Sequence, residues 1–309
     1  AAKITPTIRG SKLVLEGEAT DFNLVFDMER GEIEDYAFRG QEMISGGPRP
    51  NFWRPPTDND YGNDMPTRLG AWREASNTPP VSRVEHWQNS DRDVEIVVTR
   101  TLPSVGGSIH TVHYQVFGNG EMVISTTMEP AGLDLPDLPK FGLTLTLSPD
   151  LDQVEWFGRG PHENYADRRS GAAVGVYRAS AEELHTAYIR PQENGNRTDV
   201  RWVALSTDNG LGLLAAADSV MEFSALKFDD ADFDEGDHPT YRHAWDPIPK
   251  NHLTLDLDLV QMGVGGDTSW GARPHPEYRV SAKPYRYRIR LVPFDSGERT
   301  AEALARMKW

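Results

Sequence analysis

The chain has 309 residues, of which 38% are hydrophobic, and its eight Trp, ten Tyr and eleven Phe are enough to build a substantial core. The formal net charge of −15 argues against nucleic acid as a partner, because phosphate binding requires clustered Lys and Arg. The sequence has no cysteine, which excludes disulfides and thiolate metal sites but leaves cytoplasm and periplasm equally open as compartments.

Membrane association is not expected from the hydropathy pattern. No apolar run approaches the ~20 residues that a membrane-spanning helix needs. The start of the chain, AAKITPTIRG, lacks the apolar core of a signal peptide. We therefore expect neither a membrane nor a nucleic-acid partner.

The first distinctive segment is the polar stretch at residues 54–64, RPPTDNDYGND. Its two prolines and Gly62 predict a loop without regular structure, rich in side chains that bond to backbone. The loop is either a structural turn or a mobile segment hinged at Gly62 beside a ligand site. Residues 67–75, directly after it, are expected to form a short helix.

Alternation of apolar and polar residues dominates the rest of the chain and predicts antiparallel strands, each with one buried and one wet face. Asn119-Gly120 and Asp208-Asn209-Gly210 lie between apolar runs and predict tight hairpins. The alternating runs are found at residues 112–116, 143–147, 253–259 and 285–291.

Two Gly-rich segments, at residues 156–168 and 190–197, each place a Glu-Asn pair after a proline. Glu163 and Glu193 could serve as an acid–base pair, since glycosidic hydrolysis needs two carboxyls at ~5–9.5 Å. We favour a structural role, because neighbouring arginines would hold each glutamate ionised. These arginines are Arg159, Arg168, Arg190 and Arg197. Between the two segments, Ser180 and Glu183 match the capping box of a short helix.

The acidic stretch at residues 230–237 partly matches a calcium-binding loop. Asp230, Asp232 and Asp234 have the right spacing, but the glycine comes one residue late and Tyr241 stands where a bidentate Glu is needed. We therefore prefer a solvated acidic loop. His110 and His113 are three apart in a strand and would point to opposite faces, so we expect no metal site in this chain.

A glycine-rich segment, MGVGGDTSWG at residues 262–271, follows the strand at 253–259. No helix follows it, so it is not a dinucleotide-binding loop. Its Trp270 is either a lid over the core or a platform for a ligand, and an indole face suits the flat C–H patch of galactose. Residues 298–308 are expected to form a terminal surface helix.

Four segments in register resemble the C-terminal domain of glycoside hydrolase family 2 β-galactosidases. We number them in chain order as the first motif (RPPTDNDYG, 54–62), the second (GRGPHENYADR, 158–168), the third (RPQENG, 190–195) and the fourth (MGVGGDTSW, 262–270). The resemblance covers residues 14–294, and residues 295–309 extend past it. We expect one domain over residues 1–309, because no linker interrupts the strands and no strand–helix–strand rhythm indicates a barrel of parallel strands.

The resemblance implies the fold and the site. The fold would be an all-β antiparallel supersandwich of about eighteen strands with few short helices, like that of galactose mutarotases. The sugar site would be lined by Trp270, Asp267 and Asn59, and bordered by a mobile loop containing Gly62, Asn63 and Asp64.

The resemblance also implies what lies outside this chain. The catalytic glutamates, and the Mg²⁺ and Na⁺ of the active site, would belong to a separate barrel domain or large chain. This chain would then carry no catalytic residue and no cofactor. It would act with that partner on terminal β-D-galactosides, in an enzyme expected to be an oligomer.

Two other functions stay open at this stage. The same fold hosts stand-alone sugar epimerases, for which His162, His185, Glu163 and Glu193 would be the acid and base candidates. The chain could also be a purely structural or carbohydrate-binding module.

Overall fold

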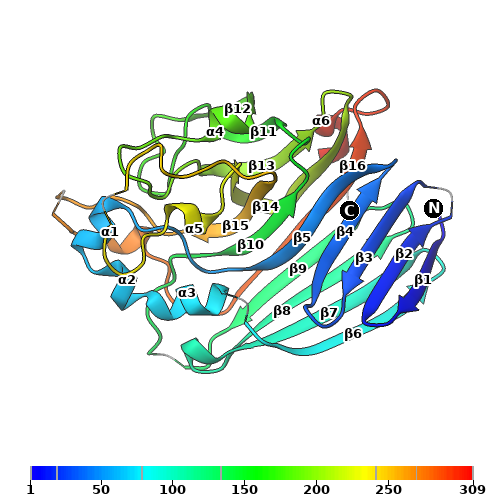
Figure 1. Cartoon of the computed structure of the whole chain (residues 1–309), viewed down its shortest axis with the longest axis horizontal. Helices are drawn as coiled ribbons and strands as arrows, with labels where there is room; N and C mark the ends of the chain where they lie inside the picture. The colour runs from blue at the N-terminus through cyan, green and yellow to red at the C-terminus, as the bar shows by residue number, and fades with distance from the viewer. Residues whose placement is uncertain are drawn as a thin grey trace.

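The computed structural model describes residues 2–18, 20–77, 79–132, 134–240, 242–268 and 270–307. Strands dominate this part of the chain (Figure 1). They are β1 (Ile4–Arg9), β2 (Lys12–Gly17), β3 (Phe22–Asp27), β4 (Glu32–Phe38), β5 (Gln41–Asn51), β6 (Val81–Ser90), β7 (Asp93–Leu102), β8 (Ser108–Phe117), β9 (Met122–Glu129), β10 (Lys140–Leu147), β11 (Gln153–Gly160), β12 (Ala173–Ser180), β13 (Arg197–Ser206), β14 (Leu211–Leu226), β15 (Leu253–Gln261) and β16 (Tyr285–Asp295).

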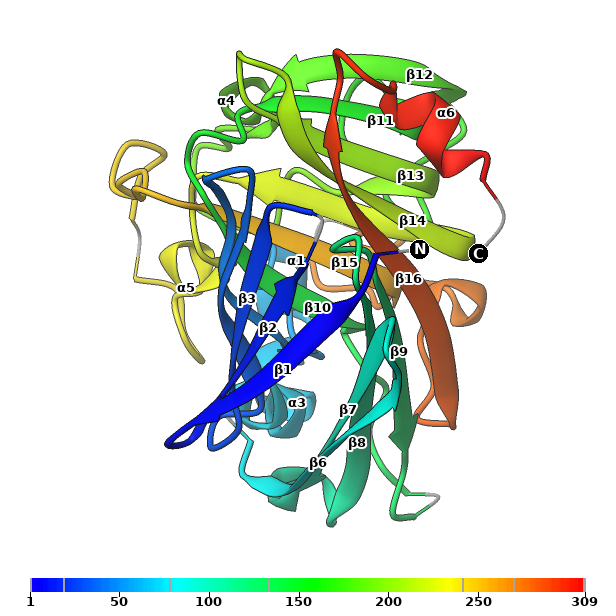
Figure 2. The same cartoon turned by 90° about the vertical axis from the view of Figure 1, so that its right-hand side faces the viewer.

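Every strand pair between these described elements is antiparallel, and all sixteen strands join one continuous sheet. The main path runs β1-β2-β3-β4-β5-β10-β15-β14-β16-β9-β8-β7-β6, and β13, β11 and β12 branch from β14. The sheet curls until β1 approaches the far end of the path (Figure 2), where the N–H of Ile4 donates to the carbonyl of Asp91 at 3.0 Å. The expected all-β antiparallel class is confirmed.

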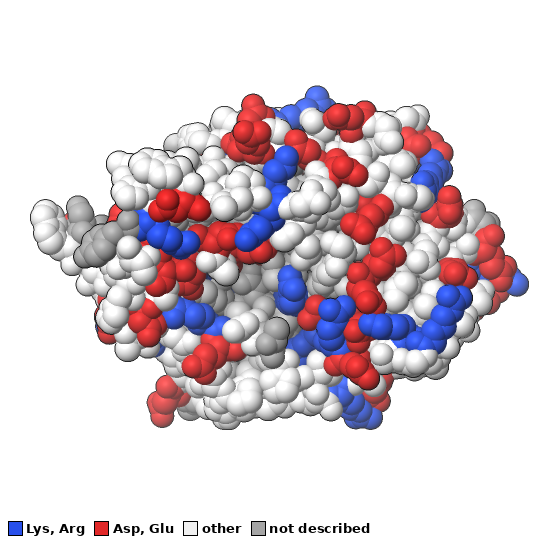
Figure 3. Space-filling model, in the orientation of Figure 1, with Lys and Arg blue, Asp and Glu red and all other residues white. Residues whose placement is uncertain are grey.

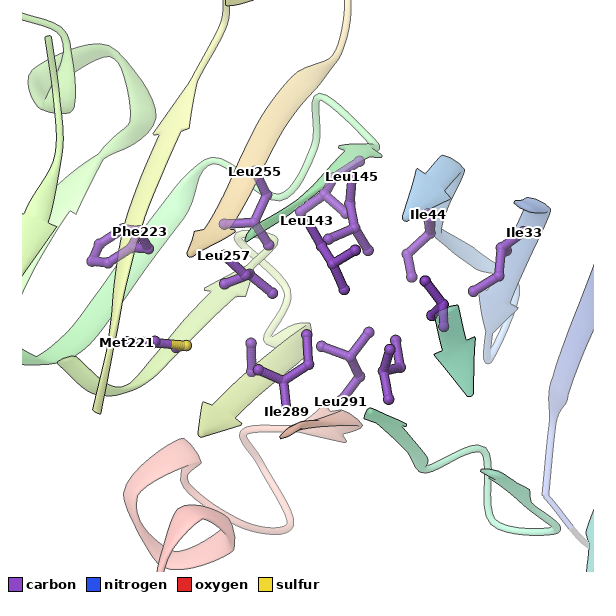
Figure 4. Close-up of a cluster of buried hydrophobic side chains, with 14 of the residues drawn as sticks. Ile33, Ile44, Leu143, Leu145, Met221, Phe223, Leu255, Leu257, Ile289 and Leu291 are labelled. Atoms are coloured by element: carbon purple, nitrogen blue, oxygen red, sulfur yellow. The ribbon is translucent and has the colours of Figure 1, made fainter. Parts of the chain in front are cut away.

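The core fills the space enclosed by the curled sheet (Figure 4). Because side chains alternate across a strand, the leucines of β10 and β15 all point to this interior side. They meet the apolar face of β16, and all but the partly buried Leu259 are fully buried. The residues drawn together there include Leu143, Leu145, Leu255, Leu257, Ile289 and Leu291.

Both predicted hairpins are confirmed. Asn119-Gly120 joins β8 to β9, and Gly120 has the positive φ of 86° that such a turn requires. Asp208-Asn209-Gly210 joins β13 to β14 in the same way.

The helices are few and short: α1 (Asp58–Gly62), α2 (Met65–Arg68), α3 (Gly70–Ser76), α4 (Ala181–Leu184), α5 (Asp230–Phe233) and α6 (Ala301–Ala305). In the described part of the chain, two single 3₁₀ turns, Pro103–Val105 and Pro276–Tyr278, accompany them. The capping box of α4 forms as expected, with Ser180 and Glu183 bonding each other's backbone N–H.

Three local expectations were wrong. Residues 54–64 were expected to be irregular, but Thr57 and Asp60 form a second capping box that starts α1. The helix expected at 67–75 is split into α2 and α3 at Leu69, which adopts non-helical dihedrals of −112° and 3°. The terminal helix is shorter than expected, because Thr300 caps α6 just before Ala301; Lys308 lies outside the described residues.

The second face of β10 and β15 is polar and only partly wet, which corrects the expectation of one wet face per strand. Asp256 and Asp258 are about as buried as Leu257 between them, at 2% and 1% exposed. Arg290 on β16 is likewise buried, held by Glu121 and by carbonyls near the end of α6.

Candidate functional site

The first motif is anchored by a fully buried ion pair. Arg54 Nη1 lies 2.6 Å from Asp60 Oδ2, and both side chains are inaccessible to solvent. Asp60 also accepts hydrogen bonds from the backbone N–H and the hydroxyl of Thr57. Arg54 Nη2 donates to the carbonyl of Gly263 at 3.3 Å, so the first motif is joined directly to the fourth.

Asn59 and Gly62 lie against the loop that carries Trp270. Asn59 Nδ2 donates to the carbonyl of Ala272 at 2.9 Å, and the N–H of Gly271 donates to Asn59 Oδ1 at 3.3 Å. The backbones of Gly62 and Gly271 touch, so a Cβ on Gly271 would fall 2.2 Å from the carbonyl of Gly62. Gly271 also has a φ of +98°, which favours glycine. Both the close backbone contact and this dihedral angle therefore require glycine at position 271.

The structure therefore brings three of the predicted residues, Asn59, Gly62 and Trp270, into one contact region. The Trp270 side chain is 86% exposed, which rules out a role as a lid over the core. Asp267 precedes Trp270 by three residues on the same loop and pairs with His275 Nε2 at 2.8 Å. Ser269, between them, lies outside the described residues.

The two other residues of the expected mobile loop have local partners. Asn63 Nδ2 donates to the carbonyl of Asn59 at 2.9 Å, and Arg68 Nε donates to the carbonyl of Asn63 at 2.8 Å. Asp64 adopts a left-handed conformation with a φ of 59° and begins α2. The mobility of this loop stays a prediction.

The second motif holds the fourth in place through Asp167. Its carboxylate accepts the backbone N–H groups of Val264 and Gly265, at 3.2 and 2.8 Å. A Cβ on Gly263 would fall 2.5 Å from Asp167 Oδ2, so the close approach of carboxylate and backbone depends on that glycine.

Glu163 and Glu193 behave differently from each other. Glu163 is held by Arg168 Nη2 at 2.5 Å, by the Tyr188 hydroxyl and by the N–H of Gly195, so the expected arginine pairing is confirmed. For Glu193 that expectation is wrong. It is 7% exposed and accepts from the Tyr165 hydroxyl at 3.2 Å, and burial raises its pKa against the opposing charges of Lys140 and Arg54.

One residue or more from each motif lines a common hollow of about 190 Å³. We call it the four-loop hollow. Its lining is Thr57, Asp58, Asn59, Tyr165, Arg168, Tyr188, Gln192, Glu193 and Val264. Arg190 of the third motif lies 2.5 Å from Asp58 of the first, which ties two sides of the hollow together.

A second hollow of about 380 Å³ adjoins it and shares two lining residues, Arg168 and Val264. Asp267 and His275 belong to this part. The predicted sugar-lining residues Asn59 and Asp267 thus line adjoining hollows.

Beneath the loops, a buried lysine lies among carboxylates. Lys140 Nζ is 2.6 Å from Asp256, 3.5 Å from Asp258 and 3.8 Å from Asp230. Burial alone would lower the pKa of Lys140, but the carboxylates outweigh burial and hold its pKa well above the usual value. Gly142 makes room for this cluster, because a Cβ there would fall 1.7 Å from Asp258 Oδ1.

This cluster and the Arg54–Asp60 pair were not predicted from the sequence. The alternation at 253–259 does place Asp256 and Asp258 on one face, which was an available signal. The alternation could not show that Lys140 pairs with that face, because strand order is not encoded in any local pattern.

Glu222 on β14 is a second buried carboxyl near this cluster. It accepts from Asn196 Nδ2 at 2.8 Å, and burial raises its pKa to about 7. The folded protein therefore holds this proton more tightly than the unfolded chain, so stability is lost as pH rises from about 4.5 through 7.

Replacing Glu222 by Gln should remove this loss. Between pH 4.5 and 8, the difference in unfolding free energy between variant and wild type should move in favour of the variant by roughly 3 kcal/mol. Urea titrations at several pH values measure it, with exposed Glu182→Gln as the control. A pH-independent difference would show that Glu222 ionises as an exposed glutamate does.

Of the residues considered for a sugar epimerase, His185 packs against aromatic rings rather than beside a carboxyl partner. Its ring packs against Phe228 and Phe233, with centroids 4.7 and 5.7 Å away, and burial lowers its pKa. His162 is exposed.

The acidic loop is held by protein cations and donors. Asp234 accepts from Trp53 Nε1 at 2.8 Å and pairs with Arg73 Nε at 3.1 Å, and Asp237 pairs with Arg73 Nη1 at 2.8 Å. Tyr241, the poor match to a calcium ligand, lies outside the described residues. In the ranges that the structure describes, no group of three or more His, Cys, Asp or Glu could hold a metal.

Across the described residues, no helix has both the length and the apolar character to cross a membrane. The fold and the loops define the class: an all-β protein with a curled antiparallel sheet and a candidate site built by four loops. The chain belongs to the β-galactosidase small-chain family, whose model, described as "Beta galactosidase small chain", matches residues 18–291. The family resemblance inferred from the motifs is confirmed.

Curated relatives bear the same name. The β-galactosidase of Priestia megaterium is 36% identical over 285 residues, covering 91% of this chain and 26% of that protein. The β-galactosidase of Halalkalibacterium halodurans is 33% identical over 284 residues, covering 89% of this chain and 27% of that protein. The chain thus spans about a quarter of the length of the curated relatives it matches.

Among solved structures, a galactose mutarotase-like protein from Lactobacillus casei aligns with a TM-score of 0.47 and 11% identity, covering 94% of this chain and all of that one. A putative mutarotase from Salmonella typhimurium aligns with a TM-score of 0.48 and 11% identity, covering 95% and 94%.

Proposed function

We propose that this chain is the non-catalytic part of a glycoside hydrolase family 2 β-galactosidase that hydrolyses terminal β-D-galactosides. It would contribute Trp270, Asn59 and Asp267 to a sugar site completed by a barrel-containing remainder or large chain. The observation that carries the proposal is the indole of Trp270, 86% exposed on a loop that Asn59 fixes from the other side.

An exposed indole on a well-anchored loop suits a site that a second part of the protein completes. Asn59 and Asp167 hold the loop on both sides of Trp270, so the ring would meet a partner with little ordering cost. Residues 62–64 would border the same cleft as the mobile loop. Assembly of the complete enzyme into an oligomer stays a prediction.

The charges of the four-loop hollow support a non-catalytic role. Hydrolysis of a glycosidic bond needs one carboxyl as acid and a second as nucleophile or base. Asp58 is paired with Arg190 and Glu163 with Arg168, which leaves Glu193 as the carboxyl with a raised pKa in this lining. The Mg²⁺ and Na⁺ implied by the resemblance do not fit the residues described here, which offer no metal-binding group, and would belong to the barrel.

The test is hydrolysis of a chromogenic β-galactoside by the purified chain, alone and together with the barrel-containing part. We expect no turnover by the chain alone and turnover by the completed enzyme. Glu163→Gln and Glu193→Gln are the decisive variants, with Glu182→Gln as the exposed control. Clear turnover by the chain alone that either decisive variant abolishes would contradict the proposal.

A further inference from the structure

A larger hollow, separate from the four-loop hollow, lies over β5, β10 and β15. Its volume is about 650 Å³, and it shares no lining residue with the four-loop hollow. In Figure 1, α5 lies above these strands and α3 below them. Figure 3 shows this face of the molecule hollowed, with acidic and basic side chains interspersed around the depression. We call it the sheet hollow.

The floor of the sheet hollow is the polar face of the sheet. Thr144 pairs in register with Arg49, and Thr146 pairs with Thr254, so these side chains form a flat array of hydroxyl and guanidinium groups. Arg49 Nη2 donates to Thr146 Oγ1 at 3.1 Å, which fixes the guanidinium against the floor.

The walls are built by two carboxylates that are already held in place. Asp229 accepts from the Thr254 hydroxyl at 2.8 Å and lies 2.9 Å from His252 Nε2. Asp234 accepts from Trp53 Nε1 and pairs with Arg73, which joins α5 to α3. Because these groups hold one another, the hollow is formed before any ligand arrives.

Asn51 and Asp230 are the lining groups that could bind a ligand with least competition from the described protein residues. Asn51 is 4% exposed, and its Nδ2 has no hydrogen-bond partner among the described residues. The carboxylate of Asp230 is 40% exposed, and its ion pair with Lys140 is long, at 3.8 Å. A buried amide left unpaired costs free energy, so a ligand that accepts from Asn51 would recover that cost.

The mixture of charges defines the chemistry of the ligand. Two arginines and three aspartates line the hollow, so it carries charges of both signs and favours neither an anion nor a cation. A sugar hydroxyl both donates and accepts, so it can bond to a carboxylate and to an amide or guanidinium at once. A monosaccharide presents several such groups around one ring.

We infer that the sheet hollow binds a neutral monosaccharide, with Asn51 and Arg49 as donors, Asp230 as acceptor and the Thr144 hydroxyl on the floor. This site goes beyond the proposed function, because it is formed within this chain and does not use Trp270.

The test is isothermal titration of the purified chain with D-galactose and D-glucose, compared with the Thr144→Val and Asp230→Asn variants. Loss of one hydrogen bond predicts about five- to tenfold weaker binding for Thr144→Val, and a loss at least as large for Asp230→Asn. Thr111→Val, also a half-buried threonine but on β8, is the matched control and should bind as the wild type does. Melting temperatures would verify that each variant is folded.

Trp270→Ala separates this inference from the proposed function. Binding that survives Trp270→Ala and weakens in Thr144→Val supports the sheet hollow, whatever the galactosidase assays give. Binding that is lost in Trp270→Ala and kept in Thr144→Val would overturn the inference and place the sugar at the Trp270 loop. The absence of measurable binding of either sugar would overturn it as well.

Discussion

Replacing Lys140 by Met should destabilise the folded protein by about 3–5 kcal/mol at neutral pH, the usual cost of breaking a buried ion pair. The side chain is 2% exposed, with Asp256 at 2.6 Å, Asp258 at 3.5 Å and Asp230 at 3.8 Å. Removing the ammonium takes away the charge that opposes burial and mutual repulsion, which already raise the pKa of Asp258 well above its usual value. Urea unfolding of the wild type and the variant measures the loss.

The control is Lys12→Met, which removes a lysine that also pairs with two carboxylates, Asp27 at 2.7 Å and Glu34 at 2.6 Å, but near the surface. Its loss should be much smaller, because solvent screens exposed pairs. Adding Asp256→Asn to Lys140→Met should restore part of the stability. Equal losses for the two lysine variants would mean that Lys140 is solvated in the native protein.

The strands could be predicted because their pattern is local. Leu253, Leu255 and Leu257 alternate with polar residues, and period-two alternation follows from strand geometry alone. The pairing of β10 with both β5 and β15 could not be predicted, because it depends on contacts between segments far apart in the chain. The burial of Asp256 and Asp258 follows from that pairing and from the loops that cover it.

Part of the site could be predicted from the spacing and order of the four motifs. Gly62 of the first motif was interpreted as a possible hinge, and no sequence pattern shows which residue a glycine will contact. The close contact between Gly62 and Gly271 depends on the tertiary structure, because the two residues are far apart in the sequence. The two prolines at 55 and 56 led to the wrong prediction of an irregular loop. The capping box of α1 begins at Thr57, immediately after them, so they do not interrupt the helix.

The expected role of Glu193 failed for a related reason. Arg190 is three residues away in the sequence, yet it pairs with Asp58 on a different loop. Glu193 instead points into the buried layer toward Tyr165, where burial governs its pKa. Closeness in sequence therefore did not determine which arginine and carboxylate form an ion pair.

Replacing Trp270 by Ala should lower kcat/KM for a β-galactoside about 5- to 150-fold in the enzyme completed by its barrel-containing part. The range corresponds to an aromatic contact worth ~1–3 kcal/mol, by analogy with stacking on flat rings. Stability should change little, because the indole is 86% exposed and few core contacts are lost. Steady-state kinetics and thermal unfolding on the same variant measure both quantities.

Trp245→Ala is the matched control, because Trp245 is also a loop tryptophan and is 77% exposed. Its ring stacks on His243 at 4.8 Å, away from the four motifs in sequence, so kcat/KM should stay at the wild-type value. Trp270→Phe should retain part of the activity, since a smaller ring still offers an aromatic face. A Trp270→Ala enzyme with normal kcat/KM would remove the sugar-platform role, and a loss shared equally by Trp245→Ala would assign the effect to general loss of exposed aromatic surface.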